Sequence, residues 1–230
     1  SHFREMAEDL AGFAIKPAKG SGGKGITVIT GRDGDEYIKA SGSRVDSPFL
    51  ERHLTNILAG LYSLAGTPDV AIVENLVESA PSLAKYSHQG VPDIRIIVFQ
   101  GYPVMAMLRL ATTASDGKAN LHQGAVGVGL DIGSGQGLNA VQFNRPITLH
   151  PDTGLALENI QIEAWDEMLE MASRCYEATG LGYMGVDLVV DANEGPLLLE
   201  LNARPGLAIQ MANGRGLLPR LRAIEALKRP

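Results

Sequence analysis

Two apolar segments near the C-terminus predict a β-hairpin that carries acidic side chains. Residues 185–191 and 196–202 are rich in valine and leucine, and the four residues between them, 192–195, read Ala-Asn-Glu-Gly. Small and polar residues of this kind between two apolar runs are typical of a hairpin turn. A four-residue loop implies the pairs Asp191–Pro196, Val190–Leu197, Val189–Leu198, Leu188–Leu199 and Asp187–Glu200.

This register gathers three oxygen-bearing side chains on one face. Asp187 lies opposite Glu200, and Asn202 shares the face of Glu200 because side chains alternate along a strand. Like charges directly opposite each other are destabilising, and a divalent cation would remove that cost. Hard oxygen ligands without a nearby His or Cys favour Mg²⁺ or Mn²⁺ over zinc. The alternative is an acidic rim on an exposed sheet.

Composition excludes several classes of protein. A chain of 230 residues with 45% hydrophobic and 20% charged residues is long enough for one large domain or two lobes. The net charge of −6 without a basic stripe argues against nucleic acid as the main partner. No apolar run is long enough for a membrane span. The single cysteine, Cys175, excludes internal disulfides and fits a reducing cytoplasm.

The first third of the chain predicts an antiparallel meander followed by a helix. Apolar residues recur at helical spacing between residues 48 and 65, and Gly66 and Pro68 would close that helix. Residues 3–11 predict a short helix of weak periodicity. The strands expected here are 13–16, 26–30, 36–40 and 70–74.

The rest of the chain alternates hairpins, loops and one long helix. Helical spacing returns from Ile162 to Tyr176 and ends at Gly180, which places Cys175 on the buried stripe as a core thiol. A final amphipathic helix is expected over 216–227, with Leu217, Leu218, Leu221, Ile224 and Leu227 on one side. Strands are expected at 93–100, 104–110, 124–132 and 137–143, and polar loops at 75–89 and 111–121.

A glycine-rich loop, residues 18–25, separates the first two expected strands. It lacks the Walker pattern, and although Gly20, Gly22 and Gly25 meet the Rossmann spacing, a strand rather than a helix follows. A glycine loop between antiparallel strands remains, as protein kinases use over ATP. Glycines let backbone N–H groups approach phosphate oxygens, and Lys16 would supply a positive charge. The alternative is a solvent loop with a surface lysine.

The order of these motifs resembles the ATP-grasp superfamily. Within it, the chain is similar to ribosomal-protein glutamate ligases, and most similar to alpha-L-glutamate ligase-like, or sugar-transfer-associated, ATP-grasp proteins. The turn after Asn202 differs from the serine-rich turn of the ribosomal-protein enzymes, so their substrate does not carry over. The likeness rests on Lys16-Pro17 before Gly20-Ser21-Gly22-Gly23, on Val73-Glu74-Asn75-Leu76-Val77, on Asp93-Ile94-Arg95, on Met107-Leu108-Arg109, on 120–124, and on Asp187 before Glu200-Leu201-Asn202.

The resemblance implies an α+β ATP-grasp fold. Two lobes with antiparallel sheets, residues 1–75 and 76–230, would enclose a nucleotide cleft, and the segment that usually precedes the ATP-grasp region would be absent. Expected nucleotide contacts are Lys16, the loop residues Gly20, Ser21, Gly22 and Gly23, the backbone of Glu74 and Leu76, Asp93 at the ribose, Lys118 and Asn120 near the triphosphate, and Leu198 beneath adenine. Asp187, Glu200 and Asn202 would hold magnesium or manganese.

The implied activity is ATP-dependent carboxylate–amine ligation through an acyl phosphate. Arg204 follows the metal-binding asparagine, where many family members carry an arginine that stabilises the transition state. Arg95 and Arg109 would grip the acyl phosphate or an acidic substrate, with structural salt bridges an equal alternative. His122 is a weaker candidate for assisting the amine.

The partners that this activity implies are a carboxylate and an amine. The group added would be glutamate or another amino acid, and the acceptor an amino acid, a peptide or a protein terminus; a homo-oligomer is compatible with the sequence. Two other functions stay open. One is a non-catalytic ATP-binding regulatory module, and the other is a phosphotransferase that acts on an alcohol.

Overall fold

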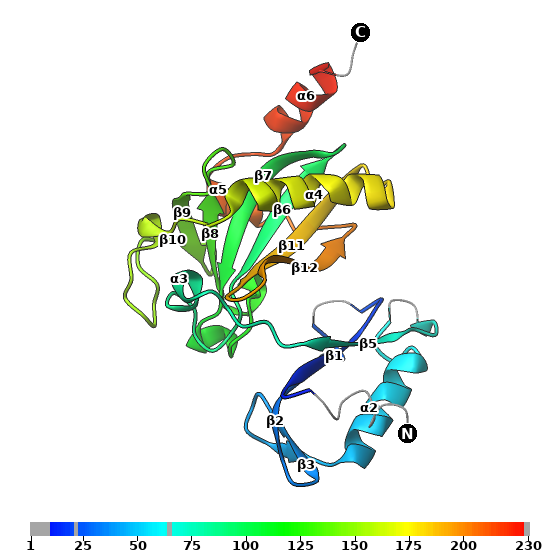
Figure 1. Ribbon diagram of the computed structural model, residues 1–230. Coiled ribbons are helices and arrows are strands. Elements are labelled where there is room, and N and C mark those ends of the chain that lie inside the picture. Colours follow the sequence, from blue (N-terminus) through cyan, green and yellow to red (C-terminus); the bar gives the residue numbers. More distant parts are fainter. Residues whose placement is uncertain (1–9, 21–22, 64–65, 228–230) are drawn as a thin grey trace. The chain divides into compact units, whose positions relative to one another are not determined.

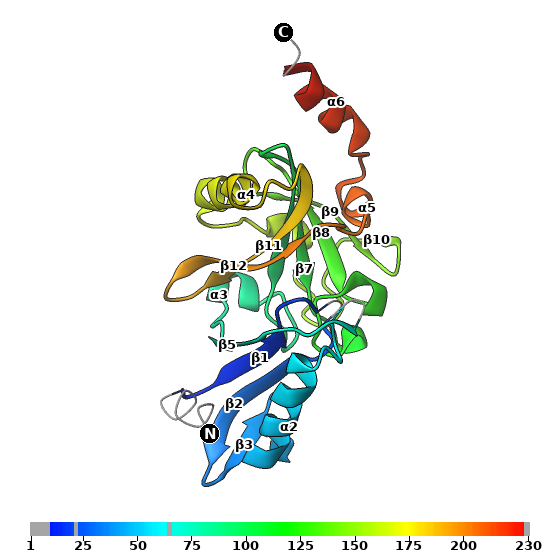
Figure 2. The ribbon, with the colours of Figure 1, turned by 90° about the vertical axis from the view of Figure 1, so that its right-hand side faces the viewer.

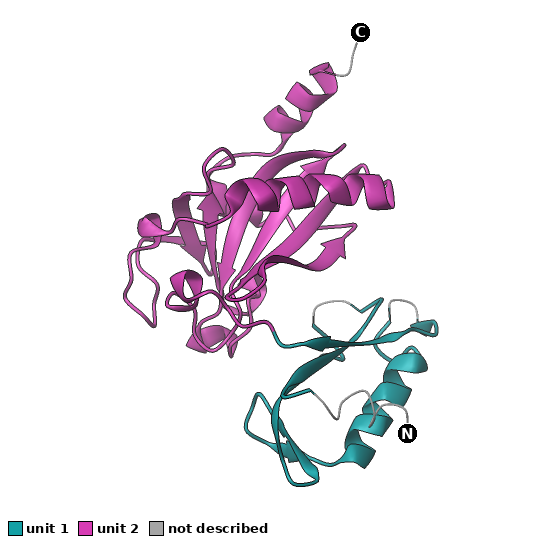
Figure 3. Ribbon diagram, in the orientation of Figure 1, with its two compact units in different colours: residues 1–76 teal, residues 77–230 magenta. Residues whose placement is uncertain are grey.

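A computed structural model describes residues 10–20, 23–63 and 66–227. Ser21, Gly22 and most of the helix expected over 3–11 therefore lie outside the described residues. The chain divides into two compact units, residues 1–76 and 77–230 (Figure 3). Each unit contains an antiparallel sheet with helices, which confirms the predicted α+β class.

Unit 1 is a five-stranded antiparallel sheet with one long helix. The sheet order is β4-β3-β2-β1-β5, so the predicted meander is extended by β5 on the far side of β1. Buried and half-buried side chains alternate along strand β1, and the core of the unit combines the buried ones with the apolar stripe of helix α2. The elements are β1 Phe13–Pro17, β2 Thr27–Asp33, β3 Glu36–Lys39, β4 Arg44–Val45, α2 Ser47–Leu58 and β5 Ala71–Asn75 (Figure 1).

Helix α2 is shorter than its apolar spacing predicts. It begins after Asp46, whose Oδ1 accepts a hydrogen bond from the Phe49 N–H at 2.8 Å. It ends at Leu58 rather than Ala65, so the predicted end was wrong. Gly60 has a φ of 82°, and a Cβ there would lie 2.2 Å from the Thr67 carbonyl oxygen. The chain turns at this close approach, which only glycine permits, and Leu61 beyond it lies outside the helix.

Unit 2 is built on a seven-stranded antiparallel sheet of order β10-β9-β8-β7-β6-β11-β12. Helix α4 covers one face and helix α5 lies on the other (Figures 1 and 2). Every helix in the described ranges is too short or too polar to cross a membrane. The elements are α3 Pro81–Ala84, β6 Asp93–Phe99, β7 Tyr102–Leu110, β8 Val126–Leu130, β9 Gly137–Gln142, β10 Arg145–Ile147, α4 Trp165–Thr179, β11 Tyr183–Asp191, β12 Gly195–Asn202, α5 Ile209–Asn213 and α6 Leu218–Leu227, with 3₁₀ turns at 113–115, 121–123 and 157–159.

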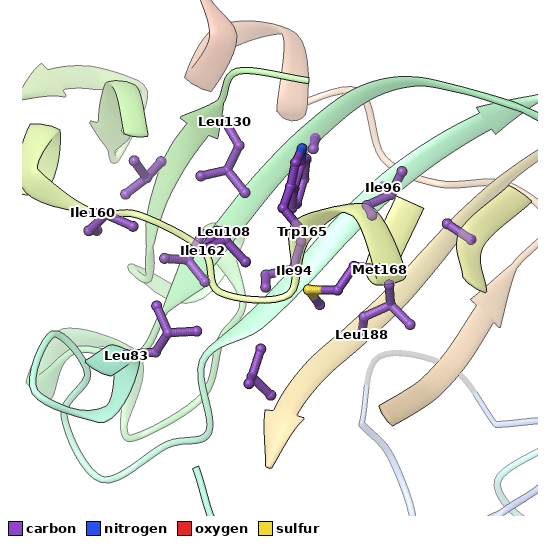
Figure 4. Close-up of a cluster of buried hydrophobic side chains, with 14 of the residues drawn as sticks. Leu83, Ile94, Ile96, Leu108, Leu130, Ile160, Ile162, Trp165, Met168 and Leu188 are labelled. Atoms are coloured by element: carbon purple, nitrogen blue, oxygen red, sulfur yellow. The ribbon is translucent and has the colours of Figure 1, made fainter. Parts of the chain in front are cut away.

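The main core of unit 2 lies between α4 and the sheet (Figure 4). Trp165 and Met168 point from the helix toward the strands, and the Trp165 indole N–H donates to the Ile132 carbonyl at 3.0 Å. The predicted helix end at Gly180 is confirmed, since Gly180 caps α4 with a φ of 68°. Cys175 is buried as predicted. The sheet side chains in this core include Ile94, Ile96, Leu108, Leu130 and Leu188.

The last predicted helix forms, but its apolar face is only partly covered. Leu221 and Ile224 of α6 pack against the second core of unit 2, and Leu217 just before the helix is buried. Leu218 and Leu227, which were expected on the same side of the helix, are 55% and 71% exposed. The apolar side chains of α6 spread over a wider part of the helix surface than the part that packs against the core.

Candidate functional site

The hairpin of β11 and β12 places Asp187 opposite Glu200, as predicted. Nearer the turn the predicted register is wrong, because Asp191 pairs with Gly195 rather than Pro196. The loop is three residues long, and a β-bulge, in which Leu199 is the additional residue of β12, brings Asp187 back opposite Glu200. The pairs observed above the bulge are Val190–Pro196, Val189–Leu197 and Leu188–Leu198.

Asp187 also faces an arginine on its other side. Strand β6 pairs with β11 so that Arg95 is the cross-strand partner of Asp187. Arg95 Nε donates to Asp187 Oδ1 at 2.7 Å and its Nη2 donates to Oδ2 at 2.5 Å. The same Nη2 lies 3.9 Å from Glu200 Oε1. A row of Arg95, Asp187 and Glu200 therefore crosses three adjacent strands, and the bidentate pair sits at its centre.

A second arginine joins this row from the next strand. Arg109 on β7 lies opposite Asp93 on β6; its Nε donates to Asp93 Oδ1, and its Nη2 donates to Asp187 Oδ2 at 2.7 Å. The Asp93 and Asp187 side chains are 8% and 0% exposed, and the two guanidinium groups are nearly as buried. Two roles were expected for Arg95 and Arg109, a grip on the substrate or a structural salt bridge. In this structure both arginines form salt bridges.

Asn202 connects the two carboxylates of the hairpin. Its Nδ2 donates to Asp187 Oδ2 at 3.2 Å and to Glu200 Oε1 at 3.0 Å. The three side chains expected to share one face are thus in direct contact. Glu200 is the open member of the group, with 57% of its side chain exposed.

The buried ion pairs shift the pKa values of both aspartates. Burial alone would raise the pKa of Asp187, but the Arg95 hydrogen bond and the charges of Arg109 and Arg95 outweigh it and hold that pKa below its ordinary value. For Asp93 burial is dominant and raises the pKa to about 7, although Arg109 opposes the shift. At neutral pH Asp187 is the charged centre of the cluster.

The cluster changes the argument for a metal ion. Arg95 and Asn202 already offset the repulsion between Asp187 and Glu200, so that repulsion is not in itself a reason for a cation. The donor chemistry still fits, because two carboxylates and an amide in mutual contact, with Glu200 open to solvent, are hard oxygen ligands for magnesium. Within the described ranges, no three His, Cys, Asp or Glu side chains are grouped so as to hold a metal.

In unit 1, Lys16 and Glu74 lie on neighbouring strands and form an ion pair. Lys16 Nζ is 2.7 Å from Glu74 Oε2, with side chains 18% and 35% exposed. The backbone of Glu74 was expected to contact the nucleotide, and the ion pair involves only its side chain, so it does not test that expectation. Leu76 is half-buried against Gly12. Of the expected loop residues, Gly20 forms an isolated bridge with Ser63, and Gly23 is exposed with a φ of 73°.

The remaining candidates lie elsewhere on unit 2. Lys118 is exposed and 3.5 Å from Asp116 Oδ2, while Asn120 caps a 3₁₀ turn by accepting from the His122 N–H at 3.0 Å. Leu198 on β12 is 46% exposed. Arg204 follows β12 and is exposed; its guanidinium makes no ion pair with any residue that the structure describes.

Sequence reasoning missed how Asp93 and the two arginines join the metal candidates. Part of the signal was present, because Asp93 and Arg95 alternate onto one face and a hairpin between residues 93 and 110 brings Arg109 near Asp93. The pairing of β6 with β11 joins residues 92 positions apart, and no local pattern marks it.

Comparisons with solved structures give distant matches to larger ATP-grasp enzymes. The ATP-grasp ligase PsnB with its minimal precursor is 15% identical over 99% of this chain and 52% of its own, with a TM-score of 0.45. D-cycloserine synthetase DcsG is 18% identical over 99% and 59%, with a TM-score of 0.47. D-alanine–D-alanine ligase from Bacillus anthracis, complexed with ATP, is 14% identical over 97% and 49%, with a TM-score of 0.43.

The chain thus spans about half the length of the solved chains it matches. No curated protein matches it. A comparison with protein families matches residues 1–226, almost the entire chain, to one family whose description agrees with the resemblance noted from the motifs. The protein is therefore a member of the sugar-transfer associated ATP-grasp family.

Proposed function

We propose that this protein is an ATP-dependent carboxylate–amine ligase that forms an amide bond through an acyl phosphate. The observation that carries the proposal is the contact of Asp187, Glu200 and Asn202 on adjacent strands, in a chain of the ATP-grasp family. Oxygen ligands in this arrangement suit the magnesium ion that accompanies ATP. The acid and the amine are defined only by class.

In unit 2, each polar group of the cluster has a distinct proposed role. Asp187, Glu200 and Asn202 would hold magnesium, which supplies charge neutralisation of the phosphates. Arg95 and Arg109 are positioning residues, because they bind Asp187 from two strands and fix its orientation. Arg204, exposed beyond the end of β12, would contact the transferring phosphoryl group or the carboxylate.

The proposed nucleotide contacts come from both units. Lys16 and the loop from Gly20 would bind the phosphates, and Lys16 would exchange Glu74 for a phosphate oxygen. The backbone of Glu74 and Leu76 would bind adenine, and Leu198 is proposed from the resemblance as an apolar contact of the base. Further contacts proposed from the resemblance are Ser21, Gly22, Gly23, Asp93, Lys118 and Asn120.

The reaction needs positioning and charge stabilisation more than covalent chemistry by the protein. A substrate carboxylate oxygen attacks the γ-phosphorus of ATP, the bond to the β-phosphate oxygen breaks, and ADP leaves. The amine then attacks the carbonyl carbon of the acyl phosphate. The C–N bond forms, inorganic phosphate departs with the bonding electrons, and the amine loses a proton. Arg204 would stabilise the charge in both steps.

Product analysis tests this proposal. Protein with magnesium and ATP is incubated with carboxylic acids and amines, alone and in pairs, and ADP, phosphate and the coupled product are quantified. The ligase reaction requires ADP and phosphate in equal amounts only when both substrates are present. ATP binding without turnover would indicate a regulatory module, and a stable phosphorylated alcohol would indicate a phosphotransferase; either result would refute the ligase.

A matched pair of variants ties turnover to the cluster. Glu200→Gln removes one charged ligand from an exposed position, so we expect the fold to persist and turnover to fall at least 100-fold. Glu194→Gln changes an exposed carboxylate in the turn of the same hairpin and should leave turnover unchanged. Equal rates in the two variants would refute the proposed metal site.

A further inference from the structure

The loop from residue 20 to residue 25 is held at both ends by buried polar side chains from outside it. One is Asp69, which precedes β5, and the other is His53 on α2; they are 7% and 9% exposed. Both belong to unit 1. Buried polar side chains need hydrogen-bond partners, and these two take theirs from the residues that flank the loop.

Asp69 holds the first end. Its Oδ2 accepts a hydrogen bond from the Lys19 N–H at 2.9 Å, and its Oδ1 accepts from the Val70 N–H at 2.7 Å. The preceding residue, Ala18, donates its N–H to the Val70 carbonyl at 2.9 Å. Ala18 and Lys19, the two residues before the loop, are therefore hydrogen-bonded to the two residues before β5.

His53 holds the second end. Its Nε2 lies 2.9 Å from the Gly25 carbonyl oxygen and 3.1 Å from Thr27 Oγ1. Because a carbonyl oxygen only accepts, Nε2 carries the proton. Thr27 begins β2 and is also buried, so the hydrogen bonds of His53 join α2 to the point where the loop becomes a strand.

Tyr62 closes the space beside this second anchor. Its ring lies 5.6 Å from the His53 ring, centroid to centroid. A Cβ on Gly25 would fall 2.5 Å from Tyr62 Cγ, and Gly25 has a φ of 79°. The backbone therefore passes directly against the Tyr62 ring, in a conformation that requires glycine. Polar and apolar contacts together define the position of Gly25.

We propose that Asp69 and His53 are positioning residues for ATP binding, which hold Lys19 and Gly25 in place at the two ends of the phosphate-binding loop. Ordering a loop on binding costs conformational entropy, and that cost falls when its ends are already fixed. The inference rests on the proposed function, since it assigns the loop to ATP. Neither residue needs to contact the nucleotide.

Limited trypsin digestion without nucleotide tests each anchor separately. Lys19–Gly20 and Lys24–Gly25 are tryptic bonds at the two ends, and Lys39 and Arg52 report on the rest of unit 1. We expect Asp69→Ala to speed cleavage after Lys19 about tenfold, and His53→Leu to speed cleavage after Lys24 similarly, since each variant loses the hydrogen bond that holds its end of the loop. Fragments are identified by mass spectrometry.

Conservative variants separate positioning from bulk. Asp69→Asn keeps one of the two acceptor oxygens, and His53→Gln keeps a donor nitrogen, so both should be cleaved more slowly than Asp69→Ala and His53→Leu. Unchanged cleavage in Asp69→Ala and His53→Leu would overturn the proposal. Acceleration at Lys39 and Arg52 by the same factor would also overturn it, because the side chains would then support the whole unit rather than the loop.

Calorimetric titration of the full chain with MgATP supplies the functional measurement. We expect the Kd for MgATP to rise about tenfold in Asp69→Ala and His53→Leu, and to rise by a smaller factor in the Asn and Gln variants. Unchanged Kd values in an otherwise ATP-binding protein would overturn the positioning role alone. Wild-type protein that binds no MgATP would refute the proposed function as well, so the two failures are distinguishable.

Discussion

Replacing Arg109 with methionine should strongly destabilise unit 2. The Arg109 side chain is 14% exposed, and its guanidinium binds the carboxylates of Asp93 and Asp187, whose side chains are 8% and 0% exposed. Removing one partner of a buried ion pair costs about 3–5 kcal/mol, because the remaining charge loses its compensation. Asp187 keeps Arg95, so the stranded charge is mainly that of Asp93. We expect Arg109→Met to lower the free energy of unfolding by about 3 kcal/mol at pH 8.

The expected loss depends on pH in a definite direction. The pKa of Asp93 is already about 7 in the intact protein, and Arg109 is one of the groups that hold it down. Without Arg109 that pKa rises further, so at pH 5.5 Asp93 is protonated in the folded variant and no buried charge is stranded. The destabilisation caused by Arg109→Met should therefore be smaller at pH 5.5 than at pH 8.

Urea unfolding followed by tryptophan fluorescence measures this loss. Trp165 is the only tryptophan, and it lies in the core of unit 2. With a slope of about 1–3 kcal/mol per molar urea, 3 kcal/mol moves the midpoint by about 1–3 M. Arg174→Met is the control, since its pair with Glu170 is about three-quarters exposed and worth about 0.3–0.5 kcal/mol. Equal midpoints for the two variants would refute the buried ion-pair argument.

Three further outcomes follow from the structure. Gly129→Ala should lower the free energy of unfolding by about 1–3 kcal/mol, because a Cβ there would lie 2.4 Å from the Ala212 carbonyl oxygen. Gly182→Ala is the control, since a Cβ there would have nothing within 4 Å, and it should cost less than half as much in the same urea assay. Folding raises the pKa of Asp93 from its ordinary 3.8 to about 7, so its contribution to stability is fully present below pH 4 and is lost as pH rises through 7. Unfolding of wild type and Asp93→Asn between pH 5 and 8 checks this, and a constant difference would contradict it. Burial raises the pKa of the Cys175 thiol, so a thiol reagent should react at least 100-fold faster with unfolded than with native protein; equal rates would place the thiol outside the core.

Local patterns were sufficient for much of the architecture. Runs of apolar and β-branched residues predicted the strands of both sheets except the short edge strands β4 and β10, and helical spacing ending at Gly180 predicted α4 with Cys175 on its buried side. The pairing of Asp187 with Glu200 was predicted as well, but from a four-residue loop, and it holds because the bulge at Leu199 compensates for the shorter loop of three residues. These features depend on residues close together in the chain, where steric preference and periodicity act directly.

Other features were decided by backbone packing that the apolar pattern does not encode. Helix α2 ends early because Gly60 packs against the Thr67 carbonyl, and the register near the hairpin turn depends on a bulge at Leu199. Neither feature can be read from the spacing of apolar residues, because a bulge or a close backbone contact leaves that spacing unchanged.

The sequence by itself determined which residues can carry the chemistry, since carboxylates, an amide and a glycine loop are readable as residue types with fixed spacing. Only the tertiary structure decided their partners. Asp187 is bound by Arg95 because β6 lies beside β11, a pairing across 92 residues. The physical reason is that the order of strands in a sheet minimises the exposed apolar area of the whole unit, and the charged partners of a buried aspartate follow from that order.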